Sequence, residues 1–246
     1  MQAVILAGGL GTRLRQVVDD RPKVMANVSG KPFLEYQVEH LKQNRIDEFV
    51  FCVGYLHDHV MEYFGDGSRL GVKIDYSVEK ELLGTAGALK HAEKLIDGVF
   101  LVLNGDSFLD CDFPGFIDFH ELKKHSNEHS PYLGTVALTQ VTDASRYGSV
   151  RLSGEGLIED FVEKSTKSTP RSSGENFINA GVYIFEPRIL SFIAGSQPFS
   201  LEKDLFPQLL EKGYRLGGYL TQGLFVDIGT PNGYFQFQEY IEARNS

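Results

Sequence analysis

The N-terminal part of the chain alternates short apolar runs with segments of helical period, and this alternation restricts the possible folds more than any other feature. Runs of strand length, rich in β-branched residues, lie at 3–6, 49–53, 72–78 and 100–103. Segments with helical spacing separate them at 33–44, 57–64 and 85–96. Strands that alternate with helices build a parallel sheet, and strands that are apolar throughout are covered on both faces.

The pattern becomes mixed after the last of these strands. Further strands are predicted at 132–140, 148–152, 157–163, 177–185, 216–220 and 224–228. Helices are predicted near 116–125, 188–193 and 201–211, and after Pro231. The polar stretch 165–175 has no apolar period and is expected to be a surface loop. The sequence therefore predicts an α/β fold, doubly wound and Rossmann-like, with a mostly parallel mixed sheet flanked by helices. We expect one domain over 1–246, with halves of about 1–110 and 111–246.

Charge and composition disfavour several classes of protein. The chain has 33 acidic and 24 basic residues and a net charge of −9, whereas a nucleic-acid binder usually displays a basic face. No apolar run approaches the roughly 20 residues that cross a bilayer, and no signal peptide is evident. Cys52 and Cys111 are too few for a disulfide framework or a zinc site. We expect a cytoplasmic protein with neither a nucleic-acid nor a membrane partner.

A glycine-rich turn follows the first predicted strand, in the sequence LAGGLGTRLR. Gly8, Gly9 and Gly11 allow main-chain N–H groups to approach a ligand closely. Such a turn at the carboxyl end of a first strand is where phosphate-bearing ligands bind in α/β sheets. Arg13 and Lys23 add two cations for phosphate oxygens. The segment is therefore a candidate phosphate site.

Two better-known phosphate loops do not fit this segment. The dinucleotide fingerprint matches at Gly9 and Gly11 but has Leu14 in place of the third glycine, which disfavours a nicotinamide-dependent oxidoreductase. The Walker loop requires Gly-Lys followed by Ser or Thr, and the only Gly-Lys pair, at Gly30, precedes a proline.

The order of the motifs resembles the signature of the sugar-1-phosphate nucleotidyltransferase family. The resemblance begins with LAGGLGTRLR, Pro22-Lys23 and Gly30-Lys31-Pro32. It continues over essentially the whole chain, through Leu83-Gly84-Thr85-Ala86-Gly87, Asn104-Gly105-Asp106, Glu163-Lys164, Asn179-Ala180-Gly181-Val182-Tyr183 and Asp227-Ile228-Gly229. It implies a fold of the GT-A-like type and an enzyme that joins a nucleoside triphosphate to a sugar 1-phosphate and releases pyrophosphate. One departure is Val24, where the family commonly has proline, which leaves the rigidity of this loop open.

Two aspartates follow apolar runs at predicted strand ends, where active-site groups collect in open α/β sheets. They are Asp106 and Asp227. Mg²⁺ is usually held by one or two carboxylates, with water and phosphate oxygens in the other positions. The resemblance implies that these aspartates bind Mg²⁺ as the cofactor. Taken alone, Asp227 is equally well explained as a turn-forming residue.

The resemblance also assigns roles in nucleotide binding and catalysis. Arg13 would brace the β- and γ-phosphates and Lys23 the α-phosphate, so that Arg13, Lys23, Asp106 and Asp227 form the catalytic set. The nucleotide-binding residues would be Leu6, Ala7, Gly8, Gly9, Gly11, Thr12, Glu79, Gly84 and Thr85. Related enzymes place their base-reading side chain at Glu79. A carboxylate only accepts hydrogen bonds, which suits the adjacent N–H and NH₂ donors of guanine and favours GTP. A solvated loop glutamate, or a UTP- or CTP-using enzyme, is the alternative.

The residues implied for the sugar-phosphate side are Asn104, Gly148, Glu163, Lys164 and Asn179. Without the resemblance, Glu163 and Lys164 would be interpreted as an exposed charge pair. The likeness favours a heptose 1-phosphate of manno configuration as acceptor, with mannose 1-phosphate as the near alternative. A non-catalytic nucleotide-sugar sensor of the same fold is the rival class.

Two further features are interpreted without a catalytic role. His120, His125 and His129 fall near a helix and a polar turn and are expected at the surface or as helix caps rather than as zinc ligands. The last predicted helix carries an aromatic stripe formed by Tyr234, Phe235, Phe237 and Tyr240. Such a stripe packs against the sheet or against a second subunit, so a homo-oligomer is possible.

Overall fold

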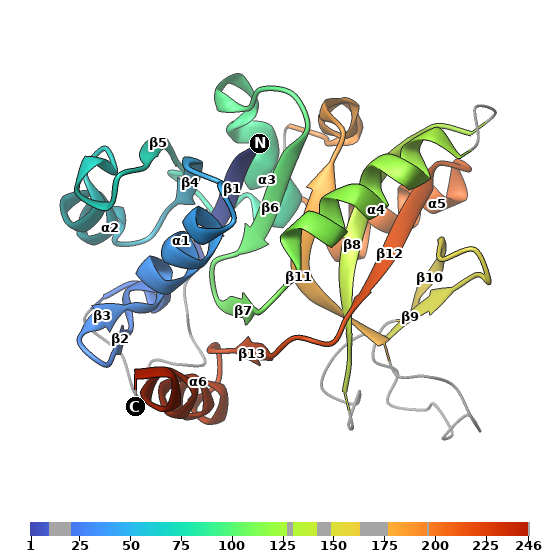
Figure 1. Ribbon diagram of the computed structural model, residues 1–246. Coiled ribbons are helices and arrows are strands. Elements are labelled where there is room, and N and C mark those ends of the chain that lie inside the picture. The colour runs from blue at the N-terminus through green and yellow to red at the C-terminus, as the bar shows by residue number, and fades with distance from the viewer. Residues whose placement is uncertain (10–20, 127–129, 142–148, 163–176, 196, 246) are drawn as a thin grey trace.

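The computed structural model describes residues 1–9, 21–126, 130–141, 149–162, 177–195 and 197–245. In this part of the chain a sheet of nine strands has the order β10-β9-β11-β6-β1-β4-β5, with β8 beside β11 and β12 beside β8 (Figure 1). The strands are β1 Gln2–Ala7, β4 Glu48–Val53, β5 Lys73–Val78, β6 Phe100–Asn104, β8 Tyr132–Gln140, β9 Ser149–Leu152, β10 Ile158–Val162, β11 Phe177–Phe185 and β12 Arg215–Thr221. β1, β4, β5 and β6 are parallel, whereas β11 joins β6 antiparallel and begins the mixed half. The predicted α/β fold with a mixed second half is confirmed.

Helices cover both faces of this sheet (Figure 1). They are α1 Phe33–Gln43, α2 His57–Phe64, α3 Gly84–His91, α4 Phe113–His125, α5 Phe206–Glu211 and α6 Pro231–Asn245. Alternate residues of β1 belong to different cores: Ile5 packs in the core formed with α1, α2 and α4, and Val4 packs in the core formed with α3 and α5. Both side chains are completely buried, which explains why the strand is apolar throughout.

A short antiparallel pair lies beside the main sheet. It consists of β7 Ser107–Leu109 and β13 Phe225–Asp227. The pair supports a third apolar cluster that α6 covers, with the fully buried Phe237 making an edge contact of 4.9 Å between ring centroids with Phe33. Phe235 is 53% exposed. The aromatic stripe thus divides: Phe237 packs inside this chain, and Phe235 faces outward.

Several local elements differ from the expectation. The helix predicted over 85–96 ends at His91 and continues as a 3-10 turn, Glu93–Leu95, and the helix predicted over 188–193 is the 3-10 segment Pro187–Phe192. The segment 201–211 begins as a π-helix, Leu201–Leu205, before α5. The hairpin of β2 Asn27–Val28 and β3 Lys31–Pro32 was not predicted, because two-residue strands carry no periodic signal.

The prediction of a surface or capping role is wrong for His120. Its side chain is fully buried, with Nδ1 2.8 Å from Thr135 Oγ1 and Nε2 3.1 Å from Glu186 Oε1. Both ring nitrogens therefore have partners, and burial lowers the pKa of this histidine.

Two further expectations concern segments rather than residues. The stretch 165–175 lies outside the described residues. Among the helices that the structure describes, none is both long and apolar enough to pass through a bilayer.

Candidate active site

The carboxyl ends of β1 and β6 are joined directly by the backbone. Gly105, the residue after β6, donates its N–H to Leu6 O at 2.9 Å. A Cβ at position 105 would lie 2.7 Å from that same oxygen, so a side chain there would force the strand ends apart. Gly105 thereby holds Asp106 next to the start of the glycine-rich turn. This glycine is a site-forming residue whose role the sequence did not specify.

Asp106 and Asp227 come together through β7 and β13. Asp227 is paired with Ser107 in the register of the two strands, and Ile228 donates its N–H to Asp106 O at 2.9 Å. Asp227 Oδ1 accepts the Gly229 N–H at 2.7 Å, which fixes the orientation of the carboxylate. Two acidic residues far apart in the sequence thus occupy adjacent positions near the end of β1.

Lys23 completes this cluster. It begins a 3-10 turn, Lys23–Met25, and its Nζ lies 2.5 Å from Asp106 Oδ2. A Cβ on Gly229 would overlap both Lys23 Nζ and Asp227 Oδ1, so these two side chains meet at the face of that glycine. The Lys23 side chain is 10% exposed, against 35% for Asp106. One cation and two carboxylates therefore converge, and Gly229 is the residue that leaves room for them.

The turn that carries Lys23 is held by packing and by backbone bonds rather than by a second proline. Val24 is 4% exposed and packs towards Gly105. Met25 N donates to Pro22 O at 2.8 Å, and Ala26 N donates to Lys23 O at 3.0 Å. These contacts fix the loop whose rigidity the sequence left open.

The donor set of this cluster fits Mg²⁺. Among the described residues no group of three or more histidine, cysteine, aspartate or glutamate side chains is placed to hold a metal ion. Two carboxylates beside a glycine-rich turn match the way Mg²⁺ is held, because this ion keeps water and substrate oxygens in its remaining positions.

Glu79 lies over the start of the glycine-rich turn. It follows β5 and is anchored by its own N–H, which donates to Val53 O at 2.8 Å. A Cβ at Gly8 would lie 2.7 Å from Glu79 Oε1, and Leu83 N donates to Glu79 Oε2 at 3.3 Å. Burial raises the pKa of this carboxyl, while the Leu83 N–H and the charge of His91 act in the opposite direction. The carboxylate is thus half-buried at the edge of the turn.

Gly84 and Thr85 begin α3 and are pressed against the segment 199–202. Gly84 has φ +74°, and a Cβ there would lie 2.6 Å from Phe199 O. The Thr85 hydroxyl donates to Glu202 Oε2 at 3.2 Å and accepts from Leu201 N at 2.8 Å. Its side chain therefore supports the protein framework in this structure.

Asn104 and Asn179 lie on the neighbouring strands β6 and β11. Gly181 has φ +72°, and a Cβ there would come 2.7 Å from Asn104 Nδ2, so glycine is needed for the two strands to approach. Asn104 Oδ1 is buried and has no hydrogen-bond partner among the described residues. Asn179 Nδ2 donates to the Tyr183 hydroxyl at 2.8 Å. The amide side chains flank the same sheet edge as Asp106.

Comparison with known proteins decides the family. The family model for nucleotidyl transferases matches residues 2–244. The chain belongs to the nucleotidyl transferase family. The nucleotidyltransferase is 39% identical, over 96% of its chain and 98% of the relative, to the D-glycero-alpha-D-manno-heptose 1-phosphate guanylyltransferase of Campylobacter jejuni. It is 38% identical to the mannose-1-phosphate guanylyltransferase catalytic subunit beta of Xenopus tropicalis, where the match covers 95% of this chain but only 62% of that protein.

A solved structure agrees with the fold. HddC from Yersinia pseudotuberculosis, crystallised in complex with GMP-PN, superposes with a TM-score of 0.79 and 32% identity, covering 98% of this chain and 99% of HddC. The resemblance inferred from the ordered motifs is confirmed, and the protein is an enzyme of the nucleotidyltransferase class.

Six of the residues predicted for the site lie outside the described part of this nucleotidyltransferase. They are Gly11, Thr12, Arg13, Gly148, Glu163 and Lys164. Their roles stay predictions. Leu6, Ala7, Gly8 and Gly9 are described and form the end of β1 and the beginning of the turn.

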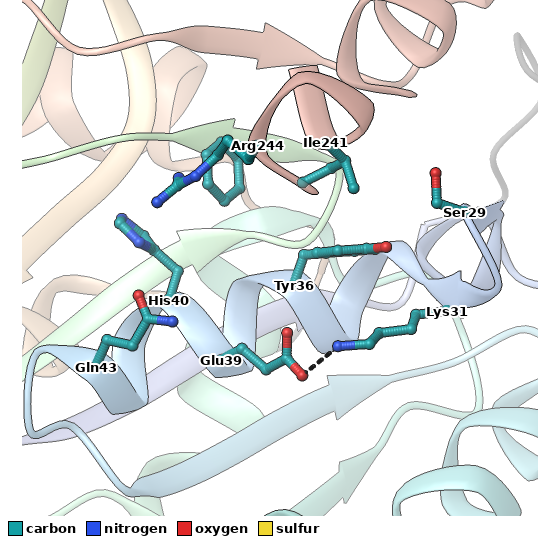
Figure 2. A pocket seen from close by; sticks show the side chains of 9 residues that line it. Ser29, Lys31, Tyr36, Glu39, His40, Gln43, Ile241 and Arg244 are labelled. Atoms are coloured by element: carbon teal, nitrogen blue, oxygen red, sulfur yellow. Dashed lines mark hydrogen bonds and ion pairs between the residues drawn. The ribbon is translucent and has the colours of Figure 1, made fainter. Parts of the chain in front are cut away.

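A separate pocket of about 280 Å³ lies between α1 and α6 (Figure 2). Its lining residues are Ser29, Lys31, Tyr36, Glu39, His40, Gln43, Phe108, Ile241 and Arg244. Figure 2 shows Glu39 of α1 paired with Lys31 of β3, and Arg244 entering from α6. The distance from Lys31 Nζ to Glu39 Oε1 is 2.6 Å. Of the predicted active-site residues that the structure describes, none lines this pocket, which is therefore distinct from the cluster at the end of β1.

Proposed function

We propose that this enzyme transfers GMP from GTP to the phosphate of a sugar 1-phosphate, with D-glycero-α-D-manno-heptose 1-phosphate as the favoured acceptor, and releases pyrophosphate. The observation that carries the proposal is the convergence of Lys23, Asp106 and Asp227 beside the end of β1. The same strand end lies under the Glu79 carboxylate. Phosphate chemistry and a base-reading acceptor thus share one edge of the sheet.

The nucleotide would bind to the half formed by about 1–110, and the sugar phosphate to the half formed by about 111–246. In the first half, the backbone of Leu6, Ala7, Gly8 and Gly9 leads into the turn, which Gly11, Thr12 and Arg13 complete as predicted phosphate ligands. Open α/β sheets bind ligands outside the carboxyl ends of their strands, which is where Ala7, Gly8 and Gly9 lie.

The reaction requires positioning and charge neutralisation more than covalent help from the protein. An oxygen of the sugar phosphate attacks the α-phosphorus of GTP in line, forming the new P–O bond while the bond to the bridging oxygen of pyrophosphate breaks. Lys23, which is largely buried, would neutralise negative charge that develops at the α-phosphate. Asp106 and Asp227 would hold Mg²⁺, which supplies further charge neutralisation at the phosphate oxygens.

Guanine would be read by Glu79. The N1–H and N2–H donors of guanine match the two acceptor oxygens of one carboxylate. Uracil and thymine instead present a single N–H between two carbonyls, which a carboxylate repels. The complex of the Yersinia protein with GMP-PN supports a guanine nucleotide for this chain as well.

The acceptor side rests on Asn104 and Asn179, together with the predicted contacts of Gly148, Glu163 and Lys164. The choice of a heptose over mannose is supported by the similarity to the Campylobacter enzyme, which extends over 98% of that protein, against 62% of the mannose-1-phosphate enzyme. Mannose 1-phosphate is the alternative acceptor.

The proposal is tested by measuring pyrophosphate release with ATP, CTP, GTP and UTP against heptose, mannose and glucose 1-phosphates, each with and without Mg²⁺. We expect the highest kcat/KM for GTP with the heptose 1-phosphate, and loss of turnover when EDTA removes the metal. Pyrophosphate release with mannose 1-phosphate but not with the heptose 1-phosphate would make mannose 1-phosphate the acceptor. No release with any pair would favour a non-catalytic sensor.

Gly8 gives a prediction about the base site. In Gly8→Ala the new methyl group would displace the Glu79 carboxylate, because it would lie 2.7 Å from Oε1. The obstructing atoms are the end of a flexible side chain, so the fold tolerates the change. We expect GTP to bind about tenfold more weakly, with Tm shifted by only ~1–2 °C. Calorimetric titration and thermal unfolding measure both. Gly154→Ala, where a Cβ meets nothing within 4 Å, is the control.

A further inference from the structure

Tyr183 is a completely buried side chain on β11 whose hydroxyl is used by neither the phosphate cluster nor the base site. The hydroxyl donates to Glu202 Oε1 at 2.9 Å and accepts from Asn179 Nδ2 at 2.8 Å. Burial raises the pKa of Tyr183 well above its ordinary range, so the hydroxyl remains a donor at every working pH. It therefore links Glu202, in the π-helix Leu201–Leu205, to an amide at the edge of the acceptor side.

The hydrogen-bond pattern allows one orientation of the Asn179 amide. Tyr183 has a single hydroxyl proton and gives it to Glu202, so its oxygen faces Asn179 as an acceptor. Asn179 Oδ1 accepts from Gly181 N at 2.9 Å. A flipped amide would place its oxygen against the Tyr183 oxygen and its NH₂ against another N–H, losing both bonds. Asn179 thus keeps one N–H and one lone pair with a defined direction for a ligand.

The other oxygen of Glu202 serves the nucleotide side. Glu202 Oε2 accepts from Thr85 Oγ1 at 3.2 Å and from Ser200 Oγ at 2.9 Å. Thr85 belongs to the first turn of α3, directly after the loop that begins at Glu79. Ser200 also caps the π-helix by accepting from the N–H groups of Glu202 and Lys203, each at 3.2 Å. Ser200, at the start of the same π-helix, therefore helps to hold the Glu202 carboxylate, which also accepts hydrogen bonds from Tyr183 on β11 and Thr85 on α3.

We propose that Glu202 is a positioning residue shared by the two substrate sites. One oxygen, through Tyr183, sets the direction of the Asn179 amide that faces the sugar phosphate. The other oxygen, through Thr85, fixes the start of α3 beside the base-reading loop. This inference rests on the proposed function, since it assigns the two arms to the acceptor and to the nucleotide.

Three variants separate the arms. Tyr183→Phe keeps the buried ring and removes the hydroxyl, so we expect KM for the sugar 1-phosphate to rise about tenfold while the Kd of GTP stays within about twofold. Thr85→Val removes the hydroxyl of the other arm. We expect the Kd of GTP to rise about tenfold, with little change in KM for the sugar 1-phosphate. Glu202→Ala, which removes both acceptor oxygens, is expected to weaken the binding of both substrates.

The matched control is Tyr132→Phe. Tyr132 is 6% exposed on β8, and its hydroxyl lies 2.7 Å from Thr135 Oγ1. Its loss removes a buried hydrogen bond of the same kind without touching Asn179. We expect Tm to fall about as much as in Tyr183→Phe, with both substrate constants unchanged.

The outcomes distinguish this inference from the proposed function. A wild-type protein that releases no pyrophosphate and binds no GTP rejects the proposed function itself. If the wild type turns over, and Tyr183→Phe has a lower Tm but an unchanged KM for the sugar phosphate, the network is merely structural. That result overturns the inference. A Glu202→Ala variant that affects only one substrate also overturns it, because the shared role requires the binding of both substrates to change.

Discussion

Asp106→Asn is expected to lower the rate of pyrophosphate release by about 10²–10³-fold, as is typical when one preorganised charged group is removed from a transition-state site. The carboxylate bonds Lys23 at 2.5 Å and adjoins Asp227, so its neutralisation frees the lysine and leaves one acidic residue for the metal. The fold is expected to persist, because the bonds that place residue 106 come from backbone atoms of Gly105 and Ile228. Steady-state kinetics with saturating Mg²⁺ and a thermal melt measure the two effects.

Asp110→Asn is the control for this variant. Asp110 is the residue directly after β7, and its side chain is 44% exposed. It accepts a hydrogen bond from the Tyr240 hydroxyl at 3.2 Å, away from Lys23. It loses the same charge and should keep wild-type turnover. Asp227→Asn should resemble Asp106→Asn, and the double variant should lose little more than either, because groups that act as a unit are not additive. Near-normal turnover of Asp106→Asn would remove both aspartates from the proposed mechanism.

The sequence predicted the strand ends of this site but not how they meet. The apolar runs before Asp106 and Asp227 indicate that each aspartate lies at or just past the end of a strand, since continuous apolarity is typical of buried strands. The contact between them depends on β7 and β13, three residues each, and on the small size of Gly105 and Gly229. Strands this short have no measurable period, so their pairing could not be inferred without the family resemblance.

The other limit of the sequence analysis concerned polar side chains that are partly or fully buried. Periodicity identifies apolar faces, and it assigns a charged side chain on an amphipathic segment to solvent. Glu202 and His120 are both exceptions, because each finds its partners on elements distant in sequence: Glu202 with Tyr183, and His120 with Glu186. The fold class and the glycine-rich turn follow from local patterns, whereas these networks depend on tertiary contacts.

Glu79→Gln is expected to change the base preference of the enzyme. Glutamine offers one acceptor and one NH₂ group, so one guanine donor would face another donor, whereas uracil presents an N–H beside a carbonyl that an amide can match. We expect kcat/KM to fall about 10²-fold for GTP and to rise for UTP, since each base contact of this kind contributes ~1–3 kcal/mol of discrimination. Glu81→Gln, an exposed carboxylate two positions later, should change neither. An unchanged preference for GTP would remove Glu79 from base reading.

The same residue predicts a pH dependence with a definite sign. Burial raises the pKa of Glu79, and in the described part of the chain the titratable groups that face it from other elements are the Cys52 thiol on β4 and His91 on α3. As the pH falls through this raised pKa the carboxylate gains a proton, loses an acceptor and binds guanine more weakly, so KM for GTP should rise towards acid pH in the wild type but not in Glu79→Gln. A folded-state pKa above the unfolded value also means that the ionised group lowers stability at neutral pH. Glu79→Gln should therefore melt at or above the wild-type Tm while its affinity for GTP falls. This combination separates a base-reading role from simple damage to the fold.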